Sequence, residues 1–375
     1  MTGISTNLIH SADKLSRVSD VIPPINVTTT FKYNEDYNKL VTAKDSPKDG
    51  IIGNHIYSRL SHPNSETVEK LLESILDGNV VVYNSGLAAF FAALTYFNPK
   101  TIAIGRGYHG CHGIADLFTR IKGLKQIALE DDFSVLEKGD LVCLETPVNP
   151  DGKVFDIQHY AAKAHEKGAF LLVDSTFAPP PLQHPFEWGA DIIMHSATKY
   201  LGGHSDLLAG CLVTKDINVK NQLVEDRIYL ATNIGNLESY LLIRSLRTYE
   251  LRLLQQSKNA DEIVKFLVSN KHKYPHLAKV YHGSLQSEDY VKRQLPNGGS
   301  PVLSIDVDSE EYAKRLPSKL KYFHHATSLG GVESLIEWRA LSDPTVHPTL
   351  LRISVGIENI EDLKSDLDQA FSSDI

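Results

Sequence analysis

The chain of 375 residues is poor in cysteine, and its three cysteines, Cys111, Cys143 and Cys211, are widely spaced. That spacing makes neither a metal-binding pattern nor a disulfide framework, which fits a reducing compartment. Sixteen histidines are present, but no pair forms an HExxH motif, so no metal site is predicted. No apolar run approaches transmembrane length, and the N-terminus lacks the apolar core of a signal peptide. These absences favour a cytoplasmic protein that does not enter a membrane.

An excess of positive charge is also missing. The chain has 38 lysines and arginines against 46 acidic residues, a formal net charge of -8, which argues against a nucleic-acid-binding surface. The hydrophobic content of 42% is sufficient for a sizeable core, and the length predicts two domains. No internal repeat and no low-complexity tract is found.

Short apolar runs alternate with helical patterns between about residues 65 and 235, which predicts an α/β domain with a mostly parallel sheet covered on both faces. Seven strands are expected, over residues 80–83, 101–105, 126–129, 141–145, 169–174, 192–195 and 210–214. A polar N-terminal arm precedes them and ends in a loop at 44–50. A long helix is expected from Asn236 past Leu267, followed by a smaller α+β domain with strands at 301–307 and 350–355 and a last helix at 360–371.

Residues 195–204, HSATKYLGGH, contain the most informative group of side chains. Lys199 stands between small hydroxyl residues and a double glycine, directly after an apolar run. Asp174 closes another apolar run twenty-five residues upstream. A lysine amine, hydroxyls that can hold a phosphate, and a carboxylate at the end of a neighbouring strand are what pyridoxal 5′-phosphate (PLP) requires of a protein.

The same chemistry indicates a phosphate site at the start of a helix. Residues 85–89, SGLAA, follow the strand predicted at 80–83, and backbone amides at such a turn can bind an anion together with the hydroxyls of Ser196 and Thr198. Because parallel strands place their carboxyl ends at one edge, Asp174, Asn149 and Lys199 are expected near one ligand.

The chain resembles the Cys/Met-metabolism, or trans-sulfuration, family of PLP-dependent enzymes over nearly its whole length. The lysine motif, residues 328–335 (SLGGVESL) and residues 352–358 (RISVGIE) are specific to that family. Segments 23–31, 57–59, 84–89, 145–150 and 173–177 support them. The resemblance implies fold type I of the PLP-dependent transferases, which is aspartate-aminotransferase-like. It further implies an arm at 1–50 that contributes to a neighbouring subunit, a large PLP-binding domain at 51–235 and a C-terminal domain at 236–375.

The resemblance also implies roles for individual residues. Lys199 is expected to be the Schiff-base lysine and proton shuttle, Asp174 to pair with the pyridine nitrogen, and Tyr108 to stack on the ring. The remaining residues expected to bind PLP are Gly86, Leu87, Asn149, Ser196 and Thr198, with Tyr57 and Arg59 reaching the phosphate of a neighbouring subunit. Arg352 is expected to bind the substrate α-carboxylate, assisted by Ser328 and Leu329, and Glu337 matches a glutamate of γ-acting members. Shared sites of this kind imply a homodimer or homotetramer.

Two departures from the family pattern concern the substrate. Members that act on cystathionine usually carry an arginine a few residues after the tyrosine, and Gly113 stands at that position here. Arg106 and His112 are candidate replacements. Residues 338–343, WRALSD, also differ from the usual text. Cystathionine as the substrate therefore stays open.

The resemblance thus predicts a PLP-dependent enzyme that makes or breaks a carbon–sulfur bond in a sulfur amino acid, by γ-elimination or γ-replacement. A lyase of the cystathionine beta-lyase type, acting by β-elimination, is the alternative within the enzyme class. A PLP-binding protein with little catalysis is the alternative from another class.

Overall fold

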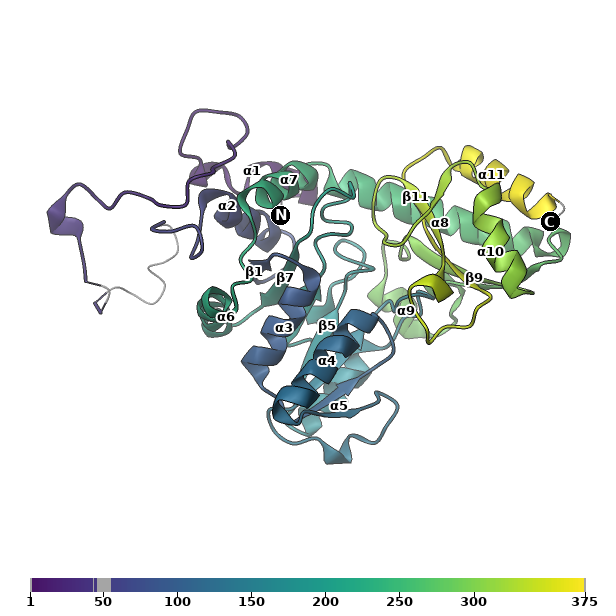
Figure 1. The fold of residues 1–375 in the computed structure, drawn as a ribbon, viewed down its shortest axis with the longest axis horizontal. Coiled ribbons are helices and arrows are strands. Elements are labelled where there is room, and N and C mark those ends of the chain that lie inside the picture. Colours follow the sequence, from purple (N-terminus) through teal and green to yellow (C-terminus); the bar gives the residue numbers. More distant parts are fainter. Residues whose placement is uncertain (1, 43, 46–54, 374–375) are drawn as a thin grey trace.

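The computed structural model describes residues 2–42, 44–45 and 55–373. The loop predicted at 44–50 lies outside the described residues except for 44 and 45, which form a turn. Two sheets follow one another along the long axis of the molecule (Figure 1), each with its own helices. The seven-stranded sheet with its helices is called the first domain below, and the five-stranded sheet with its helices the second domain. Among the described residues, no helix combines the length and apolar character needed to cross a membrane.

The first sheet has seven strands in the order β1-β7-β6-β5-β4-β2-β3. Its strands are β1 (Asn79–Tyr83), β2 (Thr101–Ile104), β3 (Lys125–Ile127), β4 (Leu141–Glu145), β5 (Phe170–Asp174), β6 (Ile192–His195) and β7 (Gly210–Thr214). The strands from β3 to β6 run parallel, whereas β7 is antiparallel to both β1 and β6. The mostly parallel seven-stranded sheet predicted from the sequence is therefore confirmed.

Helices cover both faces of this sheet, because the strands are apolar on both sides. Val81 and Tyr83 of β1 pack into one buried cluster, and Val80 and Val82 into the other. The first cluster includes side chains of α3 (Gly86–Phe97), α4 (His109–Lys122) and α6 (Ile217–Leu230). The second includes α2 (Pro63–Glu73), α5 (Ile157–Glu166) and α7 (Asn236–Leu246). Residues buried on both faces explain why these strands read as continuous apolar runs.

The long helix predicted from Asn236 is wrong as one element, since it is divided into α7 and α8 (Tyr249–Asn270). The backbone of Thr248 leaves helical geometry at φ -121 and ψ 11. Arg252 of α8 donates from Nη2 to the carbonyl of Ser245, at the end of α7, and from Nη1 to the carbonyl of Tyr200. The break thus lets Arg252 donate a hydrogen bond to a carbonyl at the end of α7 and fix the segment that follows Lys199.

The second sheet has five strands in the order β10-β11-β12-β9-β8, of which only the pair β10 and β11 is parallel. Its strands are β8 (Leu277–Tyr281), β9 (Val302–Val307), β10 (Phe323–His325), β11 (Ser334–Trp338) and β12 (Leu350–Ser354). Its helices are α9 (Asp289–Gln294), α10 (Glu310–Lys319) and α11 (Ile360–Ser372), with α8 running into it from the first domain (Figure 1). The sequence did not indicate β11, because its Glu337 interrupts the apolar run. That glutamate is tolerated because it lies opposite Arg352 of β12.

The N-terminal segment begins with α1 (Ile4–His10) and then extends away from the body as far as residue 42 (Figure 1). Large apolar side chains on it are exposed, including Val21 at 92%, Val27 at 80% and Tyr37 at 78%. Exposed apolar side chains in this number along one segment are typical of a surface that another chain covers.

Candidate active site

The main candidate site is a cavity of about 500 Å³ beyond the carboxyl ends of β4, β5 and β6. Register places the last residues of β4 and β5, Glu145 and Asp174, side by side. The loop after β6 brings Lys199, and the second domain brings Ser328 and Arg352. Of the residues predicted from the sequence, the lining contains Gly86, Leu87, Tyr108, Asn149, Asp174, Ser196, Thr198, Lys199, Ser328, Leu329 and Arg352. A cavity at this edge of the sheet is where α/β folds bind ligands.

The amine of Lys199 is held between the two domains. Its Nζ donates to Oγ of Ser328 at 2.7 Å. Burial, together with the positive charge of Arg352, lowers the pKa of Lys199 to about 8, although the charge of Glu337 acts in the opposite direction. A lysine with a lowered pKa has a larger neutral fraction, and the neutral amine is the nucleophile.

The loop that carries Ser328 is strained and packs closely on the lysine. Ser328 has a φ of +83, a backbone conformation that is unfavourable for any residue with a side chain. Gly330 has a φ of +84, and a Cβ there would lie 2.8 Å from the amide nitrogen of Tyr200 and 2.9 Å from the carbonyl carbon of Lys199. Only glycine lets this loop approach so closely. The strain therefore occurs where the second domain meets the lysine.

The carboxyl groups of Asp174 and Glu145 are both buried and lie side by side. Thr176 donates to Oδ1 of Asp174 from its hydroxyl at 2.6 Å and from its amide at 3.0 Å. Burial raises the pKa of Asp174, against these two hydrogen bonds. Burial also raises the pKa of Glu145, and the charge of Asp174 raises it further. Among the described residues no lysine or arginine forms an ion pair with Asp174, so its Oδ2 suits a cationic N–H from a ligand.

The start of α3 forms a cradle opposite Ser196. A Cβ on Gly86 would lie 2.9 Å from Cβ of Ser196 and 3.0 Å from its Oγ, so a side chain would fill the space there. The N-cap Ser85 accepts from the amide of Ala88, which leaves the amides of Gly86 and Leu87 as the unpaired donors of the first turn. Thr198 also lines the cavity, but its hydroxyl already donates to the carbonyl of Ala209. These donors and the acceptor at Asp174 fit the phosphate and the ring nitrogen of PLP.

Tyr108 stands at the start of α4, half-exposed at the cavity wall, where its amide donates to Oε2 of Glu145 at 2.8 Å. Gly110 makes room for its ring, since a Cβ there would lie 2.6 Å from Cε1 of Tyr108. The backbone amide of Asn149 donates to Oε1 of Glu145 at 2.6 Å. Glu145 therefore fixes two residues that the sequence predicts to bind PLP.

Arg352 is buried at the opposite wall, at 4% exposure. Its Nη1 donates to Oδ1 of Asn149 at 3.0 Å, and its Nη2 to the carbonyl of Ser328 and to Oε2 of Glu337. Burial opposes ionisation of Glu337, but Arg352, Ser342 and Arg339 outweigh it and lower its pKa. Glu337 does not line the cavity, so its position favours holding arginines in place over contact with substrate.

Tyr57 and Arg59 do not line the cavity of their own chain. They lie next to the N-terminal segment, through a bridge between Thr30 and Tyr57, and Arg59 stacks over the Tyr57 ring at 5.1 Å. Arg106 is also directed elsewhere, because its Nη2 forms an ion pair with Asp151 at 2.7 Å. His112 lines a small adjoining cavity, which shares Tyr108, Glu145 and Asp174 with the main one.

Several residues of the cavity were not assigned a role from the sequence, among them Glu145, Thr176, Arg339 and Ser342. Glu145 ends a predicted strand next to Asp174, and this position alone could have indicated it. Arg339 and Ser342 lie in the segment that departs from the family pattern. The resemblance connected this segment with the substrate, but nothing in the sequence indicated that these two side chains line the cavity.

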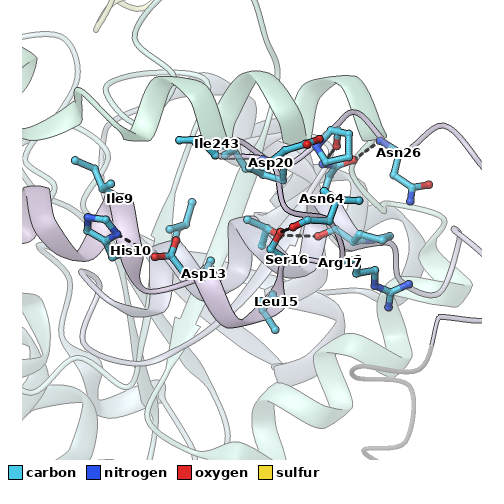
Figure 2. Close-up of a pocket in the computed structure, with 18 of the residues that line it drawn as sticks. Ile9, His10, Asp13, Leu15, Ser16, Arg17, Asp20, Asn26, Asn64 and Ile243 are labelled. Atoms are coloured by element: carbon cyan, nitrogen blue, oxygen red, sulfur yellow. Dashed lines mark hydrogen bonds and ion pairs between the residues drawn. The ribbon is translucent and has the colours of Figure 1, made fainter.

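A second cavity, of about 410 Å³, lies under the N-terminal segment (Figure 2). Nδ1 of His10 and Oδ2 of Asp13 lie within hydrogen-bond distance there, and the side-chain amide of Asn64 is hydrogen-bonded to the backbones of Pro24 and Asn26. None of the residues predicted to bind cofactor or substrate lines it. The chemistry is therefore assigned to the cavity around Lys199.

Comparison with known proteins gives a consistent result over the whole chain. The family model for Cys/Met metabolism PLP-dependent enzymes matches residues 5–372. The chain is 35% identical to cystathionine beta-lyase of Lactococcus lactis subsp. cremoris, over 99% of both chains. It is 34% identical to cystathionine gamma-synthase of Escherichia coli, over 94% of this chain and 93% of that protein. The crystal structure of metB from Corynebacterium glutamicum superposes with a TM-score of 0.88 at 28% identity, covering 99% of this chain and 98% of that one.

Proposed function

The chain belongs to the Cys/Met metabolism family of PLP-dependent enzymes, and on that basis we propose that it breaks or forms the carbon–sulfur bond at the γ-carbon of a sulfur amino acid. One observation carries the proposal. A lysine amine, a buried carboxylate and a buried guanidinium, from Lys199, Asp174 and Arg352, line a single cavity although they come from three separate segments.

PLP bound here supplies an electron sink conjugated to the α-carbon of the substrate. Gly86, Leu87 and Ser196 would hold its phosphate, Oδ2 of Asp174 would accept a hydrogen bond from its protonated ring nitrogen, and Tyr108 would stack on the ring. The negative charge of Asp174 keeps that ring nitrogen protonated, which is the condition for electron withdrawal.

The substrate is held by Arg352, whose guanidinium binds the α-carboxylate and fixes the orientation of the α-carbon. The freed amine of Lys199 then removes the proton from the α-carbon, since its pKa of about 8 gives a substantial neutral fraction near neutral pH. Elimination at the γ-carbon needs a second proton to leave the β-carbon. Ser328, hydrogen-bonded to Nζ of Lys199, keeps the amine within the cavity for that transfer.

The product of turnover tests this proposal. The purified enzyme, loaded with PLP, is incubated with cystathionine, homocysteine, cysteine and methionine, and the oxo acid and thiol released are identified. We expect 2-oxobutanoate from at least one substrate, because γ-cleavage leaves a four-carbon oxo acid. Pyruvate would instead indicate β-cleavage, the reaction type of the alternative. Absence of any oxo acid would contradict both and support a binding protein.

We also propose a homodimer or homotetramer in which Tyr57 and Arg59 reach the phosphate in a neighbouring subunit. Both residues lie outside the cavity of their own chain, and the N-terminal segment beside them exposes large apolar side chains. The guanidinium of Arg59 can bind a phosphate by two parallel hydrogen bonds. Sedimentation velocity should give a mass of two or four times 41.6 kDa. A fully active species of monomer mass would overturn this proposal.

A further inference from the structure

A second guanidinium, that of Arg339, lines the same cavity as Arg352. Arg339 opens η7 (Arg339–Leu341), the helical turn that follows β11, and its side chain is 3% exposed. It belongs to the segment at 338–343 that departs from the family pattern. The mechanism above gives this arginine no part.

The two guanidiniums share one carboxylate oxygen. Nη1 of Arg339 lies 3.0 Å from Oε2 of Glu337, and Nη2 of Arg352 lies 2.6 Å from the same atom. The other acid near Arg339 is Asp343, 3.4 Å from Nη2, whose second oxygen is occupied by Thr345. Oε2 of Glu337 is shared by two cations, and the contact with Asp343 is long. The hydrogen-bond donors of Arg339 are therefore only partly paired with protein acceptors.

Arg339 also retains free donor capacity. A guanidinium has five N–H donors in a planar fork, and the buried Nε of Arg339 has no hydrogen-bond partner among the described residues. Burying a cation whose N–H donors lack acceptors costs free energy, unless a ligand supplies the missing acceptors. Carboxylates match this geometry through paired hydrogen bonds.

Among the residues that the structure describes, the other lysines and arginines near the cavity are not available for a second carboxylate. Arg352 is assigned to the α-carboxylate, and Lys199 to the chemistry. Arg106 is bound to Asp151 and does not line the cavity. Gly113 has no side chain, and the space around it is open, on the exposed side of α4.

We propose that Arg339 determines the substrate specificity of this enzyme by binding a second carboxylate, at the far end of the sulfur substituent. The preferred substrates are therefore thioether amino acids with an acidic distal group, and neutral thioethers such as methionine react more slowly. The inference rests on the proposed function, since it concerns the substrate of the same cavity.

A matched pair of substrates tests this directly. S-(2-carboxyethyl)-L-homocysteine and its carboxamide have the same shape and the same bond to break, and they differ in the distal charge; the cysteine analogues replace them if the product is pyruvate. For the PLP-loaded wild-type enzyme, kcat/KM should be about 10- to 100-fold higher for the acid, through a lower KM. Arg339→Gln should remove this preference, and Arg339→Lys should restore part of it.

Arg106→Gln is the matched control, because it removes an arginine outside the cavity and should keep the preference for the acid. If Arg339→Gln is unstable, the charge-balanced double variant Arg339→Gln/Asp343→Asn replaces it, since it leaves no unpaired acid at 343.

Equal kcat/KM values of the wild-type enzyme for acid and amide would overturn the role of Arg339 while leaving the proposed function intact. If no sulfur amino acid is turned over, the proposed function fails, and calorimetric titration of the holoenzyme with the same pair then decides the role of Arg339. A lower dissociation constant for the acid than for the amide supports this role, and equal dissociation constants overturn it.

Discussion

Lys199→Ala should lower the rate of oxo acid release by at least about 10³-fold, because it removes the group that transfers the proton at the α-carbon. The variant should fold, since Nζ of Lys199 makes one hydrogen bond, to Ser328, and has no ion pair among the described residues. The measurement is kcat for the best substrate of the panel, with PLP in excess. Lys125→Ala, which removes an exposed lysine on the edge strand β3, is the matched control and should retain full activity. Retained turnover in Lys199→Ala would refute the assignment.

The amine itself can be examined in the protein without PLP. Since burial and Arg352 lower the pKa of Lys199 to about 8, its neutral form becomes dominant above that pH. Labelling of this residue by an amine-reactive ester, followed by peptide mass spectrometry, should rise about tenfold per pH unit below pH 8 and then level off. An ordinary exposed lysine would continue to gain reactivity to about pH 10. A continued rise at Lys199 would show that the cavity does not lower the pKa.

Asp174→Asn should reduce kcat by about 10²- to 10³-fold while preserving the fold. The asparagine carbonyl can still accept from both donors of Thr176, so the local hydrogen bonds remain. The side-chain NH2 of asparagine cannot accept a hydrogen bond from the protonated ring nitrogen of PLP, and the negative charge that keeps this nitrogen cationic is lost. The readouts are kcat and the absorbance of bound PLP.

Asp140→Asn provides a control for the loss of a buried carboxylate as such. Asp140 precedes β4, at the end of that strand opposite the cavity, and it accepts hydrogen bonds from the amides of Lys100, Thr101 and Glu137. We expect this variant to lower the melting temperature without changing kcat. If Asp174→Asn instead loses stability and retains kcat, Asp174 has a structural function only.

Much of the first domain could be predicted because its local pattern and its tertiary environment agree. Strands buried on both faces read as apolar runs, and parallel strands gather their carboxyl ends at one edge, so Asp174, Asn149 and Lys199 were expected together. The cradle at Gly86 followed from the chemistry of a turn that opens a helix. The boundaries of the seven strands of the first sheet differ from the predictions by at most two residues.

The second domain was harder to predict because long-range pairs decide its structure. Glu337 breaks the apolar pattern of β11 and is stable in a strand only because Arg352 lies opposite it on β12. The break between α7 and α8 depends on Arg252 reaching Ser245 and Tyr200. No local pattern shows such pairs. The position of Arg339 in the cavity depends on both β11 and the turn after it. The resemblance connected its segment with the substrate, but no local pattern placed the Arg339 side chain in the cavity.

The contact of Gly330 with the backbone of Lys199 has a consequence for recombination between relatives. The amide of Val332 also donates to the carbonyl of Gly203 at 3.1 Å, so the two loops are joined on both sides of the reacting lysine. The halves of this chain are therefore not interchangeable modules. A chimera that takes residues 196–203 from one parent and 328–332 from another inherits two loops that were never selected to fit, and it would misplace the amine even if each half folded correctly.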